Sequence, residues 1–228
     1  MSDKRKIAEA AIVRLSVYNR ALGEIEKEGL EIISSDELGD RIGYHATQIR
    51  KDLSCFGEFG EVGKGYFVRD LRDAISRILG VDRKWNVALA GAGHLGSALL
   101  AYPEFRQRGF NIVAVFDNDL AKIGKKWEGI VIQDTSELAK TVKEQDIRIG
   151  IIAVSPEVSQ EIVDTLTSCG VRAILNFAPA SITVGEGVEL RNVDLATELE
   201  CLSYFLTNEA EVRTEVLRKI KNNNGEGG

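Results

Sequence analysis

The first third of the chain alternates between helical hydrophobic patterns and breaks. Apolar side chains recur every three or four positions over residues 7–28, which predicts an amphipathic helix that stops at Gly29. Ser34 and Glu37 have the spacing of a capping box, so a short second helix is expected to follow them. A third helix is predicted over 45–55, where the apolar positions again keep to one face.

A glycine-rich run separates this third helix from a fourth. Four glycines between 57 and 68 exclude a helix and predict a tight hairpin. The helical pattern resumes over 68–79 and ends at Gly80. The order helix, helix, turn, helix, hairpin, helix is typical of a winged helix-turn-helix domain. We assign that domain to residues 1–80 and a linker to 81–84.

Short apolar strands alternate with helical segments in the rest of the chain, which predicts a parallel sheet covered by helices. The expected strands are 86–90, 112–116, 130–132, 149–154 and 173–177. One expected helix starts at Ser97, and two others cover 135–145 and 157–168. This α/β domain is assigned to 85–200. A helical pattern over 195–220 predicts a C-terminal helix, which we place at 201–221, and the tail 222–228 is expected to fray.

The composition is that of an ordinary globular chain, with 44% hydrophobic and 28% charged residues and a net charge of −6. The first 84 residues carry 15 basic and 15 acidic side chains, so a nucleic-acid partner must be argued from a local patch. The sequence suggests neither a membrane span nor a signal peptide. Cys55, Cys169 and Cys201 are too scattered for disulfides or a metal cluster. We expect a reduced, cytoplasmic protein without a metal.

A glycine motif follows the first strand of the α/β domain. Its residues are Gly91, Ala92, Gly93, His94, Leu95 and Gly96. Gly91 permits a tight turn, Gly93 lets the backbone approach a pyrophosphate, and Gly96 permits close packing of helix on strand. Asp117 ends the next strand, 21 residues after Gly96, where it can accept hydrogen bonds from a ribose and repel a 2′-phosphate. The pattern predicts a Rossmann-type site for NAD(H). The alternative is a glycine-rich turn beside an exposed acid.

The chain offers few groups for a dehydrogenase reaction, which needs a residue to move a proton while the hydride moves. One histidine, His94, belongs to the glycine loop, and the other, His45, to the third helix. Tyr102 is the nearest other candidate, and no segment remains for a substrate domain. We therefore expect a protein that is not an enzyme and that binds its cofactor without turning it over.

One face of the third helix carries side chains suited to a DNA major groove. Arginine and lysine can contact guanine edges and phosphates, and glutamine can contact adenine. The hairpin would bring a lysine and a tyrosine to the same duplex, and the first helix adds an arginine. The predicted DNA contacts are Arg14, Thr47, Gln48, Arg50, Lys51, Ser54, Lys64 and Tyr66. The alternative is a solvated helix face in a small cap domain.

Several motifs together resemble the redox-sensing repressor family Rex, and the resemblance runs from about Ile7 to Ile220. They are the segments 11–15, 48–54 with Arg-Lys-Asp-Leu, 63–66, 91–96, 176–179 with Asn-Phe-Ala-Pro, and 192–194. The resemblance implies a winged helix, a Rossmann-type domain and a C-terminal helix exchanged between the subunits of a homodimer. It also implies binding to pseudo-palindromic operators, with NADH and NAD+ as ligands and release from DNA by NADH.

The resemblance also implies roles for single residues. Arg50 and Lys51 would read the operator. The implied nicotinamide side is lined by Ser155, Pro156, Asn176 and Phe177, and the implied coupling network consists of Arg20, Tyr102 and Asp194. An apolar pocket of Leu195, Phe177 and Pro156 would penalise the cationic ring of NAD+ through desolvation.

Three positions depart from the family pattern. Leu195 stands where some relatives place an aromatic residue near the nicotinamide, which bears on the preference for NADH. His94 stands where arginine, lysine or asparagine is frequent, and Val62 occupies a wing position that is often basic. Lys64 could replace the contact that Val62 does not make.

Other functions remain compatible with these patterns. A small NAD-dependent oxidoreductase with an N-terminal cap would show turnover. A CoA- or nucleotide-binding module would show competition between CoA and NADH. A structural DNA-binding dimer with a vestigial nucleotide fold would bind DNA without regard to nucleotide.

Overall fold

The computed structural model describes residues 9–60 and 63–207. They form two compact units. The N-terminal unit comprises the described residues up to Lys84 together with Gln107–Gly109, and the C-terminal unit comprises Trp85–Arg106 and the described residues from Phe110 onward. The segment 81–84, expected to be a linker, thus belongs to the first unit.

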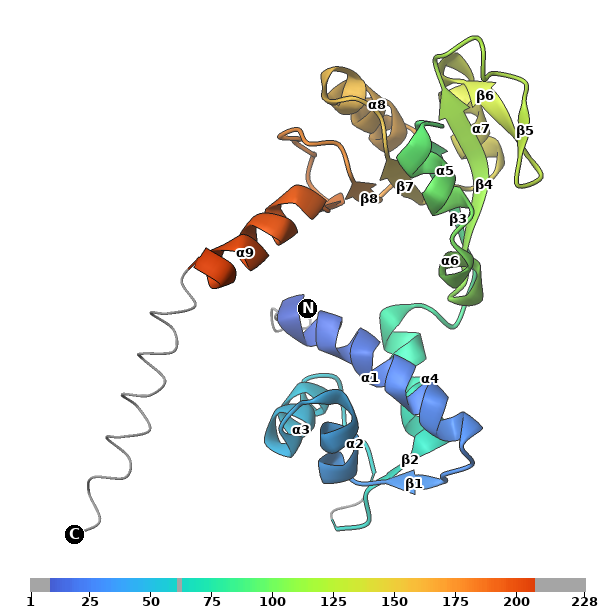
Figure 1. The fold of residues 1–228 in the computed structure, drawn as a ribbon. Helices are drawn as coiled ribbons and strands as arrows, with labels where there is room; N and C mark the ends of the chain where they lie inside the picture. Colours follow the sequence, from blue (N-terminus) through green and yellow to red (C-terminus); the bar gives the residue numbers. More distant parts are fainter. Residues whose placement is uncertain (1–8, 61–62, 208–228) are drawn as a thin grey trace. The chain divides into compact units, whose positions relative to one another are not determined.

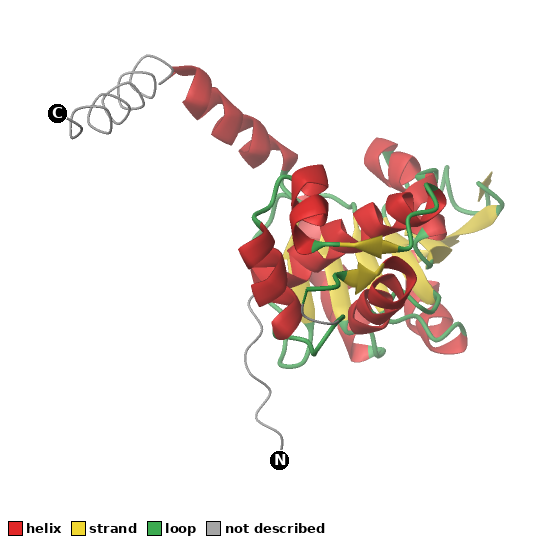
Figure 2. Cartoon of the chain, turned by 90° about the horizontal axis from the view of Figure 1, so that it is seen from below, coloured by secondary structure: helices red, strands yellow, loops and turns green. Residues whose placement is uncertain are grey.

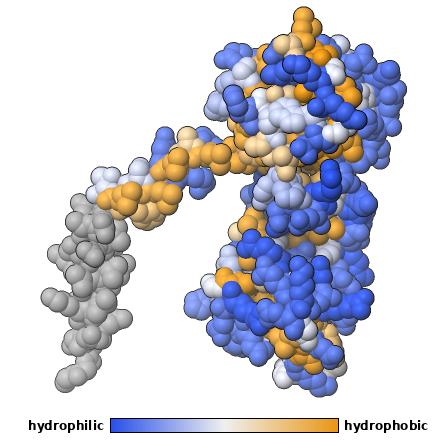
Figure 3. All heavy atoms as spheres, turned by 45° about the vertical axis from the view of Figure 1, so that its right-hand side comes forward, coloured by the Kyte–Doolittle hydropathy of each residue, from blue (hydrophilic) through white to orange (hydrophobic). Residues whose placement is uncertain are grey.

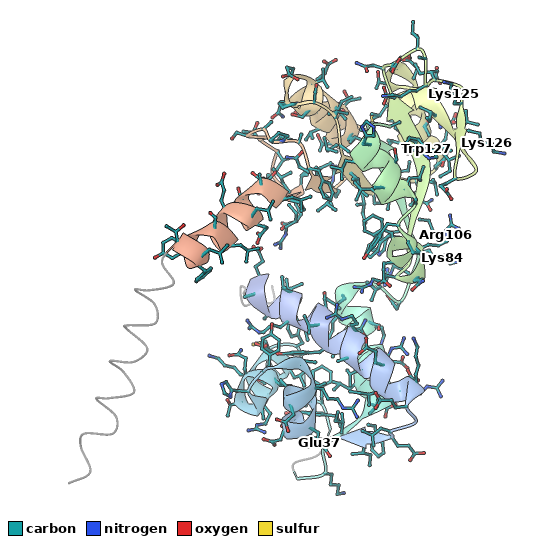
Figure 4. All side chains as sticks on the ribbon, in the orientation of Figure 1. Glu37, Lys84, Arg106, Lys125, Lys126 and Trp127 are labelled. Carbon is teal, nitrogen blue, oxygen red and sulfur yellow. The ribbon has the colours of Figure 1, made fainter. Side chains whose placement is uncertain are left out.

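The N-terminal unit is built from four helices and a two-stranded sheet (Figure 1). Its elements are α1 Glu9–Lys27, β1 Ile32–Ile33, α2 Ser35–Ile42, α3 Ala46–Ser54, β2 Tyr66–Phe67 and α4 Val68–Leu79. The predicted capping box is confirmed, because the Ser34 side chain accepts from the Glu37 backbone while the Glu37 carboxylate accepts from the Ser34 N–H. Glu37 lies in the first turn of α2 (Figure 4).

The core of this unit gathers one face of each helix. Leu15, Tyr18 and Leu22 of α1 are fully buried at the helical spacing that the sequence predicts. They pack in one cluster with Ile49 of α3 and Ile75 of α4. Burial of side chains of this size stabilises by about 1.5–3 kcal/mol each, and it fixes which face of α3 points outward.

The tight hairpin predicted within 57–68 does not appear as two paired strands among the described residues, and residues 61–62 in its middle lie outside them. The strand β2 pairs instead with β1, antiparallel, with Ile32 opposite Phe67 and Ile33 opposite Tyr66. A two-residue strand has no hydrophobic period of its own, so β1 has no recognisable pattern in the sequence. Gly65 lets the chain pass close to β1, since a Cβ there would lie 2.7 Å from the Ile33 carbonyl oxygen. Val62 lies outside the described residues.

The C-terminal unit is a seven-stranded sheet with helices on both faces (Figure 2). Its strands are β3 Trp85–Ala90, β4 Phe110–Asp117, β5 Lys126–Trp127, β6 Ile130–Asp134, β7 Ile149–Ile152, β8 Ala173–Asn176 and β9 Glu189–Asn192. Its helices are α5 His94–Leu100, α6 Pro103–Gln107, the 3-10 turn Thr135–Glu137, α7 Leu138–Glu144, α8 Pro156–Ser168 and α9 Leu195–Thr207.

The strand order is β5-β6-β4-β3-β7-β8-β9. The six strands from β6 to β9 are parallel, which confirms the predicted parallel sheet, and in sequence order they give the Rossmann arrangement 3-2-1-4-5-6. Only β5, which carries Lys126 and Trp127 at the sheet edge (Figure 4), runs antiparallel. The order reverses between β3 and β7, and ligands bind at such a switch point.

Two apolar layers cover the sheet. Ala88 and Ala90 of β3 join α7 and α8 in one cluster. The alternate residues Val87 and Leu89 join the α5 and α6 side in another. A strand buried on both faces reads as a continuous apolar run, which is why β3 is legible in the sequence.

The helix α9 carries an uncovered apolar face. Its exposed large side chains are Leu195, Leu199, Leu202, Tyr204, Phe205 and Leu206. Figure 3 shows this hydrophobic surface along α9 next to the grey end of the chain. The remainder of the expected dimerisation helix, 208–221, and the tail 222–228 lie outside the described residues. In the described part of the chain, every helix is too short or too polar to cross a bilayer.

Candidate functional site

The glycine loop lies at the switch point of the sheet. The Gly91 N–H donates to the Phe116 carbonyl at 2.8 Å, and the Ala153 N–H donates to the Ala90 carbonyl at 2.8 Å. A Cβ on Gly91 would lie 2.4 Å from the Ala153 oxygen, and one on Gly96 would lie 1.9 Å from the Gly91 oxygen. Both positions therefore require glycine, Gly91 so that the loop can lie against the segment after β7 and Gly96 so that α5 can pack against the backbone of the loop.

Gly93 differs, because a Cβ there would meet open space. It is the N-cap of α5, which begins at His94 rather than at the expected Ser97. The earlier start puts His94, Leu95 and Gly96 in the first helical turn, where backbone N–H groups lack intrahelical acceptors. The fold does not need a glycine at 93, but an approaching pyrophosphate does.

Asp117 ends β4 beside this loop and is buried, with 7% exposed. Its Oδ2 accepts from the Ala92 N–H at 2.8 Å and from Lys122 Nζ at 3.1 Å, and its Oδ1 accepts from the Asp119 N–H at 2.9 Å. Burial by itself would raise the pKa of Asp117, but these hydrogen bonds outweigh it and lower the pKa below its usual value. The carboxylate is thus charged and held in place before any ligand arrives.

Lys122 is the residue of this site that sequence reasoning missed. Its hydrogen bond to Asp117 raises the pKa of the ammonium, and Asp119 is a second carboxylate 3.7 Å away. The Lys122 side chain is about one-third exposed, so this partner of Asp117 is open to solvent. The only signal in the sequence is a lysine five residues after the acid that ends the strand.

The residues after β7 border the glycine loop. Ser155 is the N-cap of α8 and Pro156 its first residue, a position that suits proline because its missing N–H is not needed there. The Ser155 side chain is hydrogen-bonded to Glu157, which lowers the pKa of that carboxyl. The close approach of Gly91 to Ala153 brings this turn and the glycine loop together.

Asn176 is the last residue of β8, the strand that pairs with β7, and Phe177 follows it. The Asn176 side chain is 1% exposed and is fully used within the protein. Its Oδ1 accepts from the Ala178 N–H, and its Nδ2 donates to the Ala178 carbonyl and to Asn192 Oδ1, all at 2.9 Å. The Phe177 N–H donates to the Ile152 carbonyl of β7. Leu195 begins α9 with 60% of its surface exposed.

The helix α3 presents the predicted polar face to solvent. Thr47, Arg50, Lys51 and Ser54 are exposed, whereas Ile49 and Leu53 are buried. Arg50 donates to Ser35 Oγ at 2.6 Å and lies 3.7 Å from Asp36, so the N-terminus of α2 orients its guanidinium. Lys64 is exposed, and burial raises the pKa of the half-buried Tyr66 at the base of the wing.

The side chains of Arg14 and Gln48 are hydrogen-bonded within the N-terminal unit. Arg14 Nη2 and Gln48 Nε2 both donate to Asp52 Oδ1 at 2.8 Å, and Arg14 Nε and the Tyr18 hydroxyl donate to its Oδ2 at 2.5 and 2.7 Å. Burial favours a raised pKa for Asp52, but the three partners outweigh burial and lower it. The cluster ties α3 to α1, so it fixes the angle at which the exposed face of α3 is presented.

The three expected coupling residues lie in different surroundings. Arg20 is exposed on α1 and lines a concavity of about 550 Å³ together with Arg41 and Glu24. Tyr102 is half-exposed, with its ring edge-on to Phe105 at a centroid distance of 5.2 Å. Asp194 directly precedes α9, and its carboxylate accepts hydrogen bonds from the Thr197 N–H and hydroxyl in the first turn. These bonds lower the pKa of Asp194.

Within 9–60 and 63–207, no three histidine, cysteine, aspartate or glutamate side chains are grouped so as to hold a metal ion.

A winged helix-turn-helix unit with an exposed basic helix face, joined to a Rossmann-type sheet with a dinucleotide loop, defines the class of nucleotide-responsive DNA-binding regulators. Two family models match the same two regions: "Putative DNA-binding protein N-terminus" over residues 6–54 and "CoA binding domain" over residues 82–180. The redox-sensing transcriptional repressor Rex of Desulforamulus reducens is 48% identical over 201 residues, which cover 88% of this chain and 96% of that one. The chain belongs to the Rex family of redox-sensing transcriptional repressors.

Other relatives agree. The Rex repressor of Desulfitobacterium hafniense is 48% identical over 199 residues, covering 87% of this chain and 95% of its own. The Rex-family repressor RSP has a crystal structure 34% identical, with a TM-score of 0.83, covering 93% of this chain and 99% of that one. RSP in complex with NAD+ and operator DNA is similar at 35% identity and a TM-score of 0.85, covering 98% of this chain and 100% of that one. The relatives are repressors rather than enzymes, in agreement with the sequence prediction.

Proposed function

We propose that this chain is a transcriptional repressor that binds a pseudo-palindromic operator as a homodimer and is released from it by NADH. The observation that carries the proposal is that one chain combines a candidate nucleotide site with a candidate DNA-binding helix. The glycine loop and Asp117 lie at the switch point of a Rossmann-type sheet, and α3 exposes Arg50 and Lys51 on a winged helix. The solved structures of RSP with NADH and with NAD+ and operator DNA belong to the same family.

Operator reading falls to the exposed face of α3 and to the wing. Arg50 and Lys51 suit guanine edges and phosphates, and Thr47 and Ser54 lie on the same face. Lys64 and Tyr66 would add contacts from the wing. Arg14 and Gln48 remain proposed contributors, but their bonds to Asp52 give them first the task of orienting α3.

Nucleotide binding falls to the carboxyl edge of the sheet. Gly91, Ala92, Gly93, His94, Leu95 and Gly96 would hold the pyrophosphate, Asp117 the ribose, and Ser155, Pro156, Asn176, Phe177 and Leu195 would flank the nicotinamide. NADH and NAD+ differ only at the nicotinamide, in charge and planarity. An apolar flank of Pro156, Phe177 and Leu195 would therefore favour the neutral reduced ring, because desolvation penalises the cation.

Signalling between the sites would pass through Arg20, Tyr102 and Asp194, and the two units would act as separate domains joined near 81–84. The uncovered apolar face of α9 supports exchange of this helix between two subunits. A repressor of this kind works on DNA in the cytoplasm. NADH would favour a dimer whose two recognition helices no longer match half-sites about one helical turn apart.

The test is fluorescence anisotropy of a labelled Rex-type palindromic duplex, titrated with NADH and, separately, with NAD+. Release at NADH concentrations where NAD+ has little effect supports the repressor. Linkage requires that the duplex weaken NADH binding by the same factor by which NADH weakens DNA binding. DNA binding that ignores both nucleotides would contradict the proposal and favour a DNA-binding dimer with a vestigial nucleotide fold.

A second candidate ligand is CoA, because residues 82–180 match the model of a CoA binding domain. A CoA-binding module predicts that CoA displaces NADH from the C-terminal unit. NADH fluorescence that is unchanged by excess CoA would exclude it.

A further inference from the structure

The buried side chain of Asn176 reaches across to the last strand of the sheet. Two of its three hydrogen bonds close the turn at Ala178, and the third goes to Asn192 Oδ1 at the end of β9. The backbone repeats this link, since the Asn176 carbonyl accepts from the Val193 N–H at 2.8 Å. The ends of β8 and β9 are therefore joined twice, once by the main chain and once by the two amide side chains.

These two strand ends lead to different parts of the C-terminal unit. The residue after Asn176 is Phe177, whose N–H is bonded to Ile152 of β7, the strand that leads to the Ser155 turn. The second residue after Asn192 is Asp194, which accepts from the Ala196 and Thr197 N–H groups and so starts α9. The Asn176–Asn192 pair thus lies between the proposed nicotinamide flank and the start of the uncovered helix.

We propose that Asn192 is a positioning residue that couples nicotinamide occupancy to the placement of α9. Through Asn176 it makes the Phe177 turn and the Asp194 cap a single rigid piece, so a ring seated against that turn shifts the start of α9. The inference rests on the proposed function and assigns a role to a residue outside the nucleotide and DNA sites proposed above.

The chemistry of the pair favours a role in coupling rather than in folding. Asn192 is exposed, and its side chain makes this one hydrogen bond within the described part of the chain. Loss of the bond leaves the backbone link between β8 and β9 in place. It does leave one donor of the buried Asn176 without an acceptor, so the turn at Ala178 loses its side-chain link to the end of β9.

The experiment measures a coupling factor, the Kd of NADH in the presence of saturating operator divided by the Kd of NADH alone. Asn192→Leu keeps the side-chain size and removes the acceptor, whereas Asn192→Asp keeps an acceptor oxygen. Asn86→Leu is the matched control, because Asn86 also makes a single side-chain bond, 2.7 Å to the Gln145 carbonyl, but near the amino end of β3.

We expect Asn192→Leu to lower the coupling factor about fivefold, the effect of one lost hydrogen bond, with NADH still bound. Asn192→Asp and Asn86→Leu should keep the factor of the unmodified protein. An unchanged factor in Asn192→Leu would overturn the role of Asn192 while the repressor proposal stands. A factor of one in the unmodified protein would overturn both.

A second measurement needs no variant and so does not depend on folding. The Ala196 and Thr197 N–H groups both donate hydrogen bonds to the Asp194 carboxylate. Hydrogen exchange at these two amides should slow when NADH binds the full-length dimer. Exchange at these amides that ignores NADH would contradict the proposal.

Discussion

At the scale of single residues, the charged groups of both sites are held by neighbours before a ligand arrives. Asp117 accepts from two backbone N–H groups as well as from Lys122, and Arg50 is anchored by Ser35. Such preorganisation reduces what binding must spend on ordering side chains. Removal of one such group also leaves its partner in place with an unpaired charge or an unsatisfied hydrogen bond, so each substitution has a defined effect.

Asp117→Asn should weaken NADH binding and relax the rejection of NADPH. The uncharged amide no longer repels a 2′-phosphate, and Lys122 is released to attract one. A hydrogen bond to a charged group contributes about 1.5–3 kcal/mol, so the NADPH/NADH ratio of Kd should fall by roughly 10- to 100-fold. Nucleotide titrations followed by fluorescence give both constants. Asp119→Asn is the control, since this carboxylate is 46% exposed and 3.7 Å from the same ammonium; an equal shift there would refute the role of Asp117.

Arg50→Ala should cost roughly 1–3 kcal/mol of operator affinity and leave NADH binding unchanged. The guanidinium is half-exposed on α3, in the N-terminal unit, whereas the nucleotide loop lies in the other unit. Anisotropy with operator and with a scrambled duplex separates base reading from phosphate attraction. Arg77→Ala, an exposed arginine in the last turn of α4, serves as control. The same loss on both duplexes would contradict base reading by Arg50.

At the scale of elements, short contacts between segments set the shape of each site. Gly91 and Gly96 allow the loop to close on itself, and the Asp52 cluster fixes α3 against α1. In both cases a local sequence motif, the glycine loop or the polar face of α3, is held in place by a residue from another segment, Ala153 or Arg14.

Two neighbouring glycines should respond differently to the same substitution. Gly96→Ala places a Cβ 1.9 Å from the Gly91 oxygen, so we expect a loss of stability together with NADH binding. Gly93→Ala meets open space within the protein, so the fold should persist while pyrophosphate binding fails. Thermal unfolding and NADH titration of the two variants decide the point. A Gly93→Ala protein that binds NADH normally would show that the pyrophosphate does not approach there.

Tyr18→Phe should destabilise the N-terminal unit by about 1.5–3 kcal/mol, because it removes a hydrogen bond to the charged Asp52. Tyr44→Phe is the control, since its ring meets Tyr18 edge-on at 6.0 Å and its hydroxyl bonds to no other described residue. Denaturant unfolding by circular dichroism measures the difference. Equal losses in the two variants would contradict the role of the hydroxyl.

The same cluster predicts an acid dependence of stability. The pKa of Asp52 is lower in the folded protein than in the unfolded chain, where it is about 4. Its stabilising contribution is therefore complete above that pH and is lost as pH falls through the folded pKa. Asp52→Asn should be less stable at pH 7 and show a shallower decline below about pH 4. Parallel curves for the variant and the unmodified protein would exclude Asp52 as the titrating group.

At the scale of the whole molecule, the described part of α9 leaves six large apolar side chains uncovered, and such a surface is typical of an interaction site. The proposed exchange of α9 between two subunits would cover this face, and a two-fold dimer would match the proposed pseudo-palindromic operator.

Leu202→Glu should convert the dimer to a monomer. The charge enters the centre of the uncovered face, where Leu202 is 60% exposed in the single chain and would be buried between subunits. Light scattering should then report 25.0 kDa instead of twice that mass, and operator affinity should fall. Leu120→Glu is the control, because Leu120 is 84% exposed outside α9. A Leu202→Glu protein that keeps the doubled mass would place the interface elsewhere.

The sequence by itself determined the features that depend on a few neighbouring residues. The Ser34 capping box, the buried and exposed faces of α3, the alternation of strands and helices, and the glycine loop with Asp117 each follow from local spacing. Backbone geometry sets these periods, so they are legible without knowledge of what the segment packs against.

Only the tertiary structure decided which side chains are already occupied and which strands pair. Arg14 is 38 positions from Asp52, Asn176 is 16 from Asn192, and the two residues of β1 pair with residues 35 and 33 positions away. No local period encodes such a pair, because its energy appears only when the fold brings the two groups together. The same limit applies to the uncovered face of α9, because the proposed partner for it is a second chain.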